Sequence, residues 1–218
     1  MKLVPFAHKV VALLGLTVLA PLAQAQLIGV AGSKAAPEKE YGGYTMTQFE
    51  DDTRPDYTLV NKVGSPLGGS VLFGKLPVIH SEIGAGWLTW SNGYVGDVYY
   101  AASLVPLTLT LPTETKAFYF YAESNNRGNH NFTVKSGNVT LKETINGNGG
   151  AELFAFYAVG DALLSSITIS SNDITGFAIG EFGIARAVPV PEPSTYAIAG
   201  AAGLCGLVLV RRLRRKNG

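Results

Sequence analysis

Four carboxylates lie close together in the segment "EDDTRPD", an arrangement that could bind a metal ion. They are Glu50, Asp51, Asp52 and Asp56. Calcium prefers several oxygen ligands from carboxylates and backbone carbonyls, so a calcium site in this segment is the one cofactor that the sequence suggests. The spacing does not match an EF-hand loop. The alternative interpretation is a solvated acidic turn around Arg54 and Pro55.

Two further segments carry side chains of the kind that bind sugars. The segment "GWLTWSNGYVGDVYY" offers aromatic rings that could stack on sugar faces. The segment "AESNNRGNHNF" offers amide and guanidinium groups, expected at a loop tip, where binding residues concentrate. The alternative is structural, because many aromatic residues of a sandwich lie in its core and Asn/Gly-rich loops are ordinary hairpin connections. The glycan-binding candidates are Trp87, Trp90, Tyr94, Asn126, Arg127 and Asn129.

No catalytic motif is evident in the sequence. His80 and His130 stand in no recognised motif, the pattern G-x-S-x-G is absent, and we interpret both histidines as loop or strand-edge residues. Two carboxylates could converge to cleave a glycosidic bond, but no pair stands in a diagnostic context. We therefore expect no enzymatic activity. A secreted carbohydrate-active enzyme with a sandwich fold is the competing hypothesis.

The charge distribution excludes a nucleic-acid-binding domain. Of the 218 residues, the segment 26–190 contains ten Lys and Arg against fifteen Asp and Glu, a net charge of −5. Nucleic-acid binding depends on neutralising phosphates with basic residues, which this segment does not gather. The single cysteine, Cys205, lies near the C-terminus, so the middle of the chain contains no disulfide and no cysteine metal site.

Short runs with period-two alternation follow one another through the middle of the chain, separated by Gly- and Asn-rich turns. Examples are "SVLFG", "GWLTW", "DVYYA", "LTLTL", "AFYFYAE", "NVTLKE", "ELFAFYAV", "SSITIS" and "GFAIGEFGIA". No window between 45 and 187 has a helical stripe, so we predict an all-β, antiparallel two-sheet sandwich of jelly-roll type. The residues predicted to face inward are Leu107, Leu109, Leu111, Phe118, Phe120, Ile167 and Ile169.

The two ends of the chain are apolar and basic. Residues 1–25 have the features of a signal peptide, with Ala23 and Ala25 forming the small-x-small cleavage pattern, so we expect the mature chain to begin at Gln26. At the other end, residues 194–210 carry no charge and are followed by a basic segment over 211–216. This pattern predicts a transmembrane helix of minimal length with its basic end in the cytoplasm.

Pro191, Glu192 and Pro193 stand before the apolar stretch, which is followed by "RRLRRK". This C-terminal arrangement resembles the PEP-CTERM sorting signal of Gram-negative bacteria. The resemblance implies processing by an exosortase after an inner-membrane intermediate, and a final location at the cell surface or in extracellular polysaccharide. A permanent membrane anchor is the alternative. Residues 49–186 also resemble ectodomains found with such tails, which implies a fold but no activity.

These features divide the chain into four parts. We expect a signal peptide at 1–25, a flexible leader at 26–44, a β-sandwich ectodomain at 45–188 and the sorting signal at 189–218. The expected function is that of an exported surface or matrix protein with a structural or adhesive role, handled by signal peptidase and an exosortase.

Overall fold

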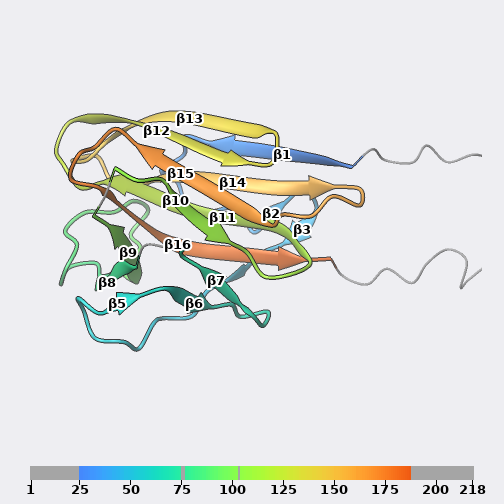
Figure 1. The fold of residues 1–218 in the computed structure, drawn as a ribbon, viewed down its shortest axis with the longest axis horizontal. Helices are drawn as coiled ribbons and strands as arrows, with labels where there is room; N and C mark the ends of the chain where they lie inside the picture. The colour runs from blue at the N-terminus through green and yellow to red at the C-terminus, as the bar shows by residue number, and fades with distance from the viewer. Residues whose placement is uncertain (1–24, 75–76, 103, 188–218) are drawn as a thin grey trace, which may run out of the picture.

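The computed structural model describes residues 25–74, 77–102 and 104–187, and within them it is a sandwich of two antiparallel sheets (Figure 1). One sheet has eight strands, with β4 (Thr47–Gln48) pairing beside β16. The order of the others is β1 (Gln26–Ala31), β14 (Glu152–Val159), β11 (Thr115–Ser124), β16 (Phe177–Arg186), β9 (Asp97–Ala101), β8 (Val78–Glu82) and β5 (Leu59–Val60).

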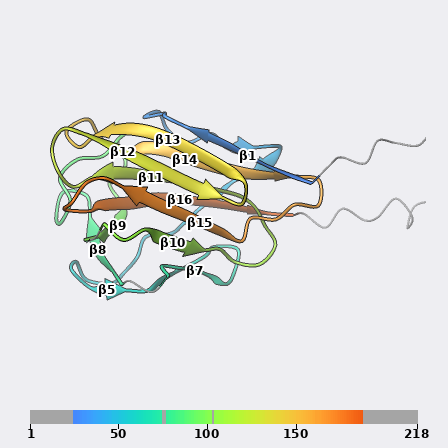
Figure 2. The same cartoon turned by 45° about the horizontal axis from the view of Figure 1, so that its top comes forward.

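The second sheet has six strands and lies across the first (Figure 2). Its order is β13 (Val139–Asn146), β12 (Asn129–Ser136), β15 (Ser166–Ser171), β10 (Leu107–Thr110), β7 (Ser70–Leu72) and β6 (Lys62–Gly64). From β9 onward, the chain moves repeatedly between the sheets: β9 lies in the first sheet, β10 in the second, β11 in the first, and β12 and β13 in the second.

The main core fills the space between the sheets, and the predicted inward positions are confirmed. All seven residues predicted to face inward are buried in this core, where Phe118 and Phe120 join Phe154 and Phe182. Burying one such side chain stabilises the fold by about 1.5–3 kcal/mol. The alternation of "LTLTL" and "SSITIS" therefore identified the side chains that hold the two sheets together.

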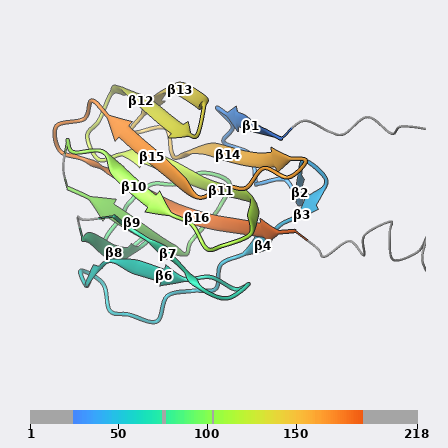
Figure 3. The same ribbon diagram turned by 45° about the vertical axis from the view of Figure 1, so that its right-hand side comes forward.

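The outer face of the eight-stranded sheet is covered as well, which the sequence did not indicate. Tyr119 and Tyr121 alternate away from the main core, yet both are buried in a second apolar cluster with Tyr41. Tyr41 belongs to a small hairpin of β2 (Glu40–Tyr41) and β3 (Tyr44–Thr45), which lies beside the ends of β14 and β16 (Figure 3). The sheet thus packs on both faces.

Two expectations from the sequence are corrected. Residues 26–44 are not a loose leader, because β1 pairs along its whole length with β14 and the β2–β3 hairpin packs on the sheet. The segment "GWLTW" is not a strand but a loop, in which side-chain hydrogen bonds replace strand pairing.

The two terminal predictions fall on residues outside the described ranges. These are the signal peptide before Ala25 and the transmembrane helix at about 194–210. Among the residues that the structure does describe, no helix is long and apolar enough to span a membrane.

Candidate functional site

The most elaborate polar site lies on the outer face of the eight-stranded sheet, beneath the loop formed by residues 86–94, which we call the tryptophan loop. Two buried carboxylates hold this loop. Glu123 on β11 accepts hydrogen bonds from the indole Nε1 of Trp87 and the hydroxyl of Thr89, both at 2.7 Å. Glu181 on β16 accepts hydrogen bonds from the indole Nε1 of Trp90 and the amide Nδ2 of Asn92, both at 3.1 Å. Each tryptophan is therefore tied to its own carboxylate.

A β-bulge directs Glu181 toward the loop. The pairing of β11 with β16 shifts register between Tyr119 and Tyr121, and Glu181 has a φ of 52°, a backbone conformation that glycine normally adopts. Glu181 reaches the outer face as a result, while the next residue, Phe182, packs in the main core. Such backbone strain persists only where surrounding contacts fix it, and here the hydrogen bonds from the loop do so.

Both carboxylates are shifted toward their neutral forms. Burial raises the pKa of Glu123 above its ordinary value, and the hydrogen bonds from Trp87 and Thr89 offset only part of that effect. Burial likewise raises the pKa of Glu181, against the opposing hydrogen bonds from Asn92 and Trp90. Perturbed carboxylates often mark functional sites, but here the side-chain hydrogen bonds that the pair accepts all come from the tryptophan loop, and Glu123 is bonded further by the backbone of Gly150.

This anchoring bears directly on the predicted glycan site. Trp87 is only 8% exposed and packs against Val98, Ala178 and Tyr100, so its ring faces are not free to stack on a sugar. Trp90 is half-buried, and so is Tyr94, whose hydroxyl donates to the carbonyl of Asp97 at 3.0 Å. The structure therefore uses the aromatic candidates mainly to cover the sheet.

The amide candidates lie elsewhere, in and beside an exposed loop. Asn126 and Arg127 lie in the β11–β12 loop, and Asn129 begins β12, where it accepts a hydrogen bond from Asn146 at 3.0 Å. Buried Asp173 braces this loop by accepting the backbone N–H of Asn126 at 2.7 Å. The loop tip is as expected, and among the described residues no hydrogen bond links its three candidates to Trp87 or Trp90.

The four predicted calcium ligands do not converge. The carboxylate of Asp52 is paired with the guanidinium of Arg54 and accepts a hydrogen bond from the Tyr99 hydroxyl at 3.0 Å. Asp56 accepts the backbone N–H of Glu82 at 2.8 Å. Glu50 and Asp51 are exposed and, with Asp52 and Arg54, line an open groove of about 540 Å³. Within the described ranges, no three His, Cys, Asp or Glu side chains are placed to hold a metal ion.

A buried ion pair that the sequence did not suggest lies next to this acidic segment. His80 on β8 is fully buried rather than a strand-edge residue, and its Nε2 lies 2.6 Å from Oδ1 of Asp97 on β9. Its Nδ1 lies 3.2 Å from the carbonyl oxygen of Pro55. Both partners are acceptors, so the ring must donate from both nitrogens, and the pair is an imidazolium and a carboxylate. The other Asp97 oxygen accepts the backbone N–H of Asp52.

The pKa of His80 reflects this arrangement. Burial lowers the pKa, but the hydrogen bonds to Asp97 and Pro55 and the charges of Asp97 and Asp52 outweigh burial and raise the pKa above its ordinary value. The residues belong to strands and loops that are distant in sequence, and they meet only because β8 pairs with β9. The ion pair fixes the acidic segment to the sheet and offers no free nucleophile or base.

The chain leaves the sandwich at one end. Gln26, at the start of β1, pairs with Val159 at the end of β14. Ala117, near the start of β11, pairs with Tyr157 of β14 on one side and with Ala185, near the end of β16, on the other. The first described strand and the last therefore have their outer ends on the same side (Figure 1). The loops β11–β12, β13–β14 and β15–β16 lie at the opposite end, because Ser124 pairs with Phe177 and Ala122 with Glu152.

No protein-family model matches the chain, and no curated protein matches it.

Proposed function

We propose that this chain is an exported protein of the bacterial surface or extracellular matrix, processed by an exosortase, with a structural or adhesive rather than an enzymatic role. The proposal takes its destination from the tail residues Pro191, Glu192 and Pro193 and from the apolar and basic segments that follow them. Signal peptidase and the exosortase are its partners during export. Extracellular polysaccharide is its partner afterwards.

The observation that supports this proposal is the placement of the chain ends. A domain held through residues after Arg186 has its β1 start and β16 end toward the point of attachment. The loop residues Asn126, Arg127 and Asn129 then lie at the far end, where an adhesive contact would form. Attachment through this end of the domain would leave the opposite end free for contact.

The strand order supports a jelly-roll assignment within this proposal. The strands from β9 to β16 divide into the orders β14-β11-β16-β9 and β13-β12-β15-β10. In both orders, strands from the first half of this run (β9 to β12) alternate with strands from its second half (β13 to β16). This alternation is expected of the two Greek keys of a jelly roll. Many binding and capsid domains use this architecture, but a fold by itself assigns no function.

A carbohydrate-active enzyme receives less support. The two buried carboxylates associated with tryptophan are engaged by the side chains of the loop above them. A glycosidase needs its carboxyl groups to flank the bond of a bound sugar, with room for that sugar between them. Loop anchoring accounts for Glu123 and Glu181 without substrate chemistry.

The test is to replace Pro191, Glu192 and Pro193 by alanine in the producing cell and to follow the protein by fractionation. We expect the variant to accumulate at full length in the inner membrane and to disappear from the extracellular fraction. The matched control is Pro37→Ala with Glu38→Ala, which removes a Pro-Glu pair from the surface of the domain. Export of the triple variant at the wild-type level would refute the sorting proposal in favour of a permanent anchor or another route.

A further inference from the structure

The outer face of the six-stranded sheet is the one broad sheet face that no other described element covers, and its chemistry is distinctive. On β12, buried Phe132 and Val134 alternate with outward Asn131, Thr133 and Lys135. The same alternation on the neighbouring strands produces a face of hydroxyl, amide and ammonium groups. On β10, β12, β13 and β15 its other outward residues are Thr108, Thr110, Asn129, Thr140, Lys142, Thr144, Asn146, Ser166, Thr168 and Ser170, and on β7 it includes the exposed Leu72, which pairs with Thr110 and Lys62.

Carboxylates are missing from this face although the domain as a whole is acidic. The six strands contain a single acidic residue, Glu143, which pairs with the buried Phe132 and so belongs to the inner side. Its carboxylate lies beside Gly32, the residue after β1. A Cβ atom added to Gly32 would lie 3.0 Å from Oε1 of Glu143. The segment 26–190 contains fifteen acidic and ten basic residues, so its negative charge is carried by other surfaces of the domain.

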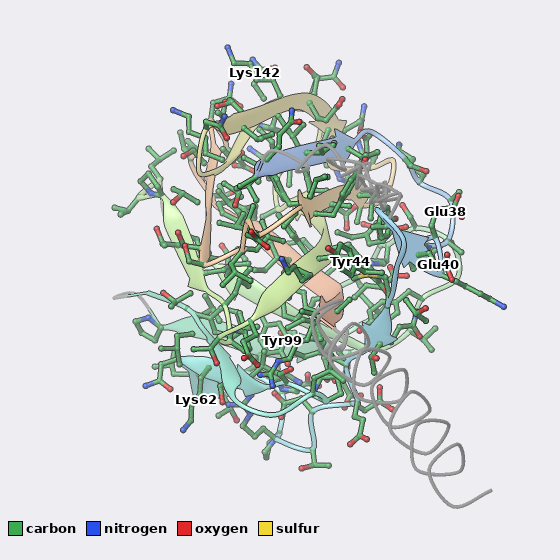
Figure 4. All side chains as sticks on the ribbon, turned by 90° about the vertical axis from the view of Figure 1, so that its right-hand side faces the viewer. Glu38, Glu40, Tyr44, Lys62, Tyr99 and Lys142 are labelled. Atoms are coloured by element: carbon green, nitrogen blue, oxygen red, sulfur yellow. The ribbon has the colours of Figure 1, made fainter. Side chains whose placement is uncertain are left out.

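Two lysines on the face are close neighbours without a counter-charge. Thr133 pairs with Lys142, and Lys135 pairs with Thr140. Lys135 and Lys142 are therefore diagonal neighbours, whose Cα atoms lie about 7–8 Å apart in such a ladder. Among the described residues, neither ammonium group forms an ion pair or a side-chain hydrogen bond. Lys62 adds a third positive charge at the far edge of the sheet, whereas Glu38 and Glu40 lie at the β2–β3 hairpin (Figure 4).

The polar groups around the two lysines are held in place. The hydroxyl of Thr144 donates to Asn131 Oδ1 at 2.9 Å, and the hydroxyls of Thr108 and Thr168 lie 3.2 Å apart. Lys142 borders a shallow depression of about 500 Å³, whose other lining residues are Asn131, Phe132, Thr133, Glu143 and Thr144. The face thus offers hydrogen-bonding groups beside two ammonium groups that have no ion-pair partner among the described residues, and an anion could neutralise them.

We propose that this face binds a carboxylated polysaccharide, with the ammonium groups of Lys135 and Lys142 pairing with uronate carboxylates and the surrounding hydroxyl and amide groups bonding sugar hydroxyls. This inference rests on the proposed function for the class of polymer, and on charge complementarity for its anionic character. A polyuronate carries one carboxylate on each sugar beside the hydroxyl groups of that sugar, which suits lysines that stand among threonines and serines. A nucleic acid carries a much denser row of charges and is bound by clustered basic residues, so it fits this face less well.

The test measures binding of polygalacturonate, a pure polyuronate, to the purified full chain in non-ionic detergent at low and high salt. Neutral dextran and double-stranded DNA serve as comparison polymers. The variant is Lys135→Gln with Lys142→Gln. The control is Lys34→Gln with Lys39→Gln, which removes the same charge from exposed positions outside the face and also removes the ion pair of Lys34 with Glu152. Thermal melting verifies that both variants remain folded.

We expect wild-type binding to polygalacturonate that weakens at high salt, and a loss of about 5- to 30-fold in the face variant, from two surface pairings of up to about 1 kcal/mol each. The control should change by less than about 2-fold. Equal losses in both variants, DNA binding as tight as polyuronate binding, or no polyuronate binding at low salt would each overturn the inference. Processing and export of the wild-type chain would be unaffected by those results, so they would leave the proposed function to its own test.

Discussion

The substitution Asp97→Asn examines the ion pair of the fully buried His80. The fully buried His80 ring donates to Asp97 and to the Pro55 carbonyl, and the second Asp97 oxygen accepts the backbone N–H of Asp52. An asparagine can still accept from His80, but it carries no charge and then turns its NH₂ group toward the N–H of Asp52. Removing one partner of a buried ion pair costs about 3–5 kcal/mol in the free energy of unfolding.

The same pair predicts a pH dependence. Because the pKa of His80 is raised in the folded state, the stabilisation is complete below its ordinary value of 6.5 and declines as the pH rises through the folded-state pKa. In Asp97→Asn the carboxylate that favours the imidazolium is gone, and burial then lowers the pKa of the ring. The decline in stability above pH 6.5 should therefore disappear.

The assay is thermal and denaturant unfolding between acidic and mildly alkaline pH. A loss of 3–5 kcal/mol corresponds to a melting temperature lower by about 10 °C, since 1 kcal/mol shifts a domain of this size by about 2–4 °C. The control is Asp51→Asn, an exposed carboxylate nearby that should change stability by less than about 0.5 kcal/mol. A melt of Asp97→Asn within about 1–2 °C of wild type, with an unchanged pH profile, would refute the ion-pair assignment.

Three further predictions follow from the described contacts. Glu123→Ala leaves the Trp87 indole without its acceptor, so unfolding free energy should fall by about 1–3 kcal/mol and tryptophan emission should shift; unchanged emission and stability would mean that the loop is not anchored there. Gly183→Ala places a methyl group against the Tyr119 ring and should lower the free energy of unfolding, measured by chemical denaturation, by about 1–3 kcal/mol. The control Gly64→Ala meets no atom within 4 Å, and equal effects of the two variants would argue against this packing. Calcium or a chelator should leave the melting temperature unchanged because Arg54 already pairs with Asp52; a calcium-dependent rise of several degrees, lost in Asp51→Asn, would restore the calcium site.

The alternating segments were readable from sequence because each has one face in the main core. Leu107, Leu109 and Ile167 alternate with Thr and Ser, and all three are buried as expected. β1 was missed because its Gly29 and Ala31 give little apolar contrast, and its strand state depends on pairing with β14. Local alternation of apolar and polar residues is clearest where the two faces of a strand meet different environments, as in β10 and β15.

The polar sites were harder to predict because their members are distant in sequence. His80 and Asp97 meet through the pairing of β8 with β9, and Trp90 meets Glu181 across 91 positions. The sequence did point to the tryptophan loop and the acidic segment, but it could not show that the tryptophans anchor a loop or that Arg54 neutralises Asp52. Those outcomes depend on which side chain a long-range contact brings nearest.

The measurement that tests the central proposal most directly is intact-mass spectrometry of the protein recovered from the extracellular fraction of its producing cell. The proposal predicts a chain that begins at Gln26 and lacks the basic segment from Arg211 to Lys216. An extracellular chain that retains this basic segment would contradict exosortase processing.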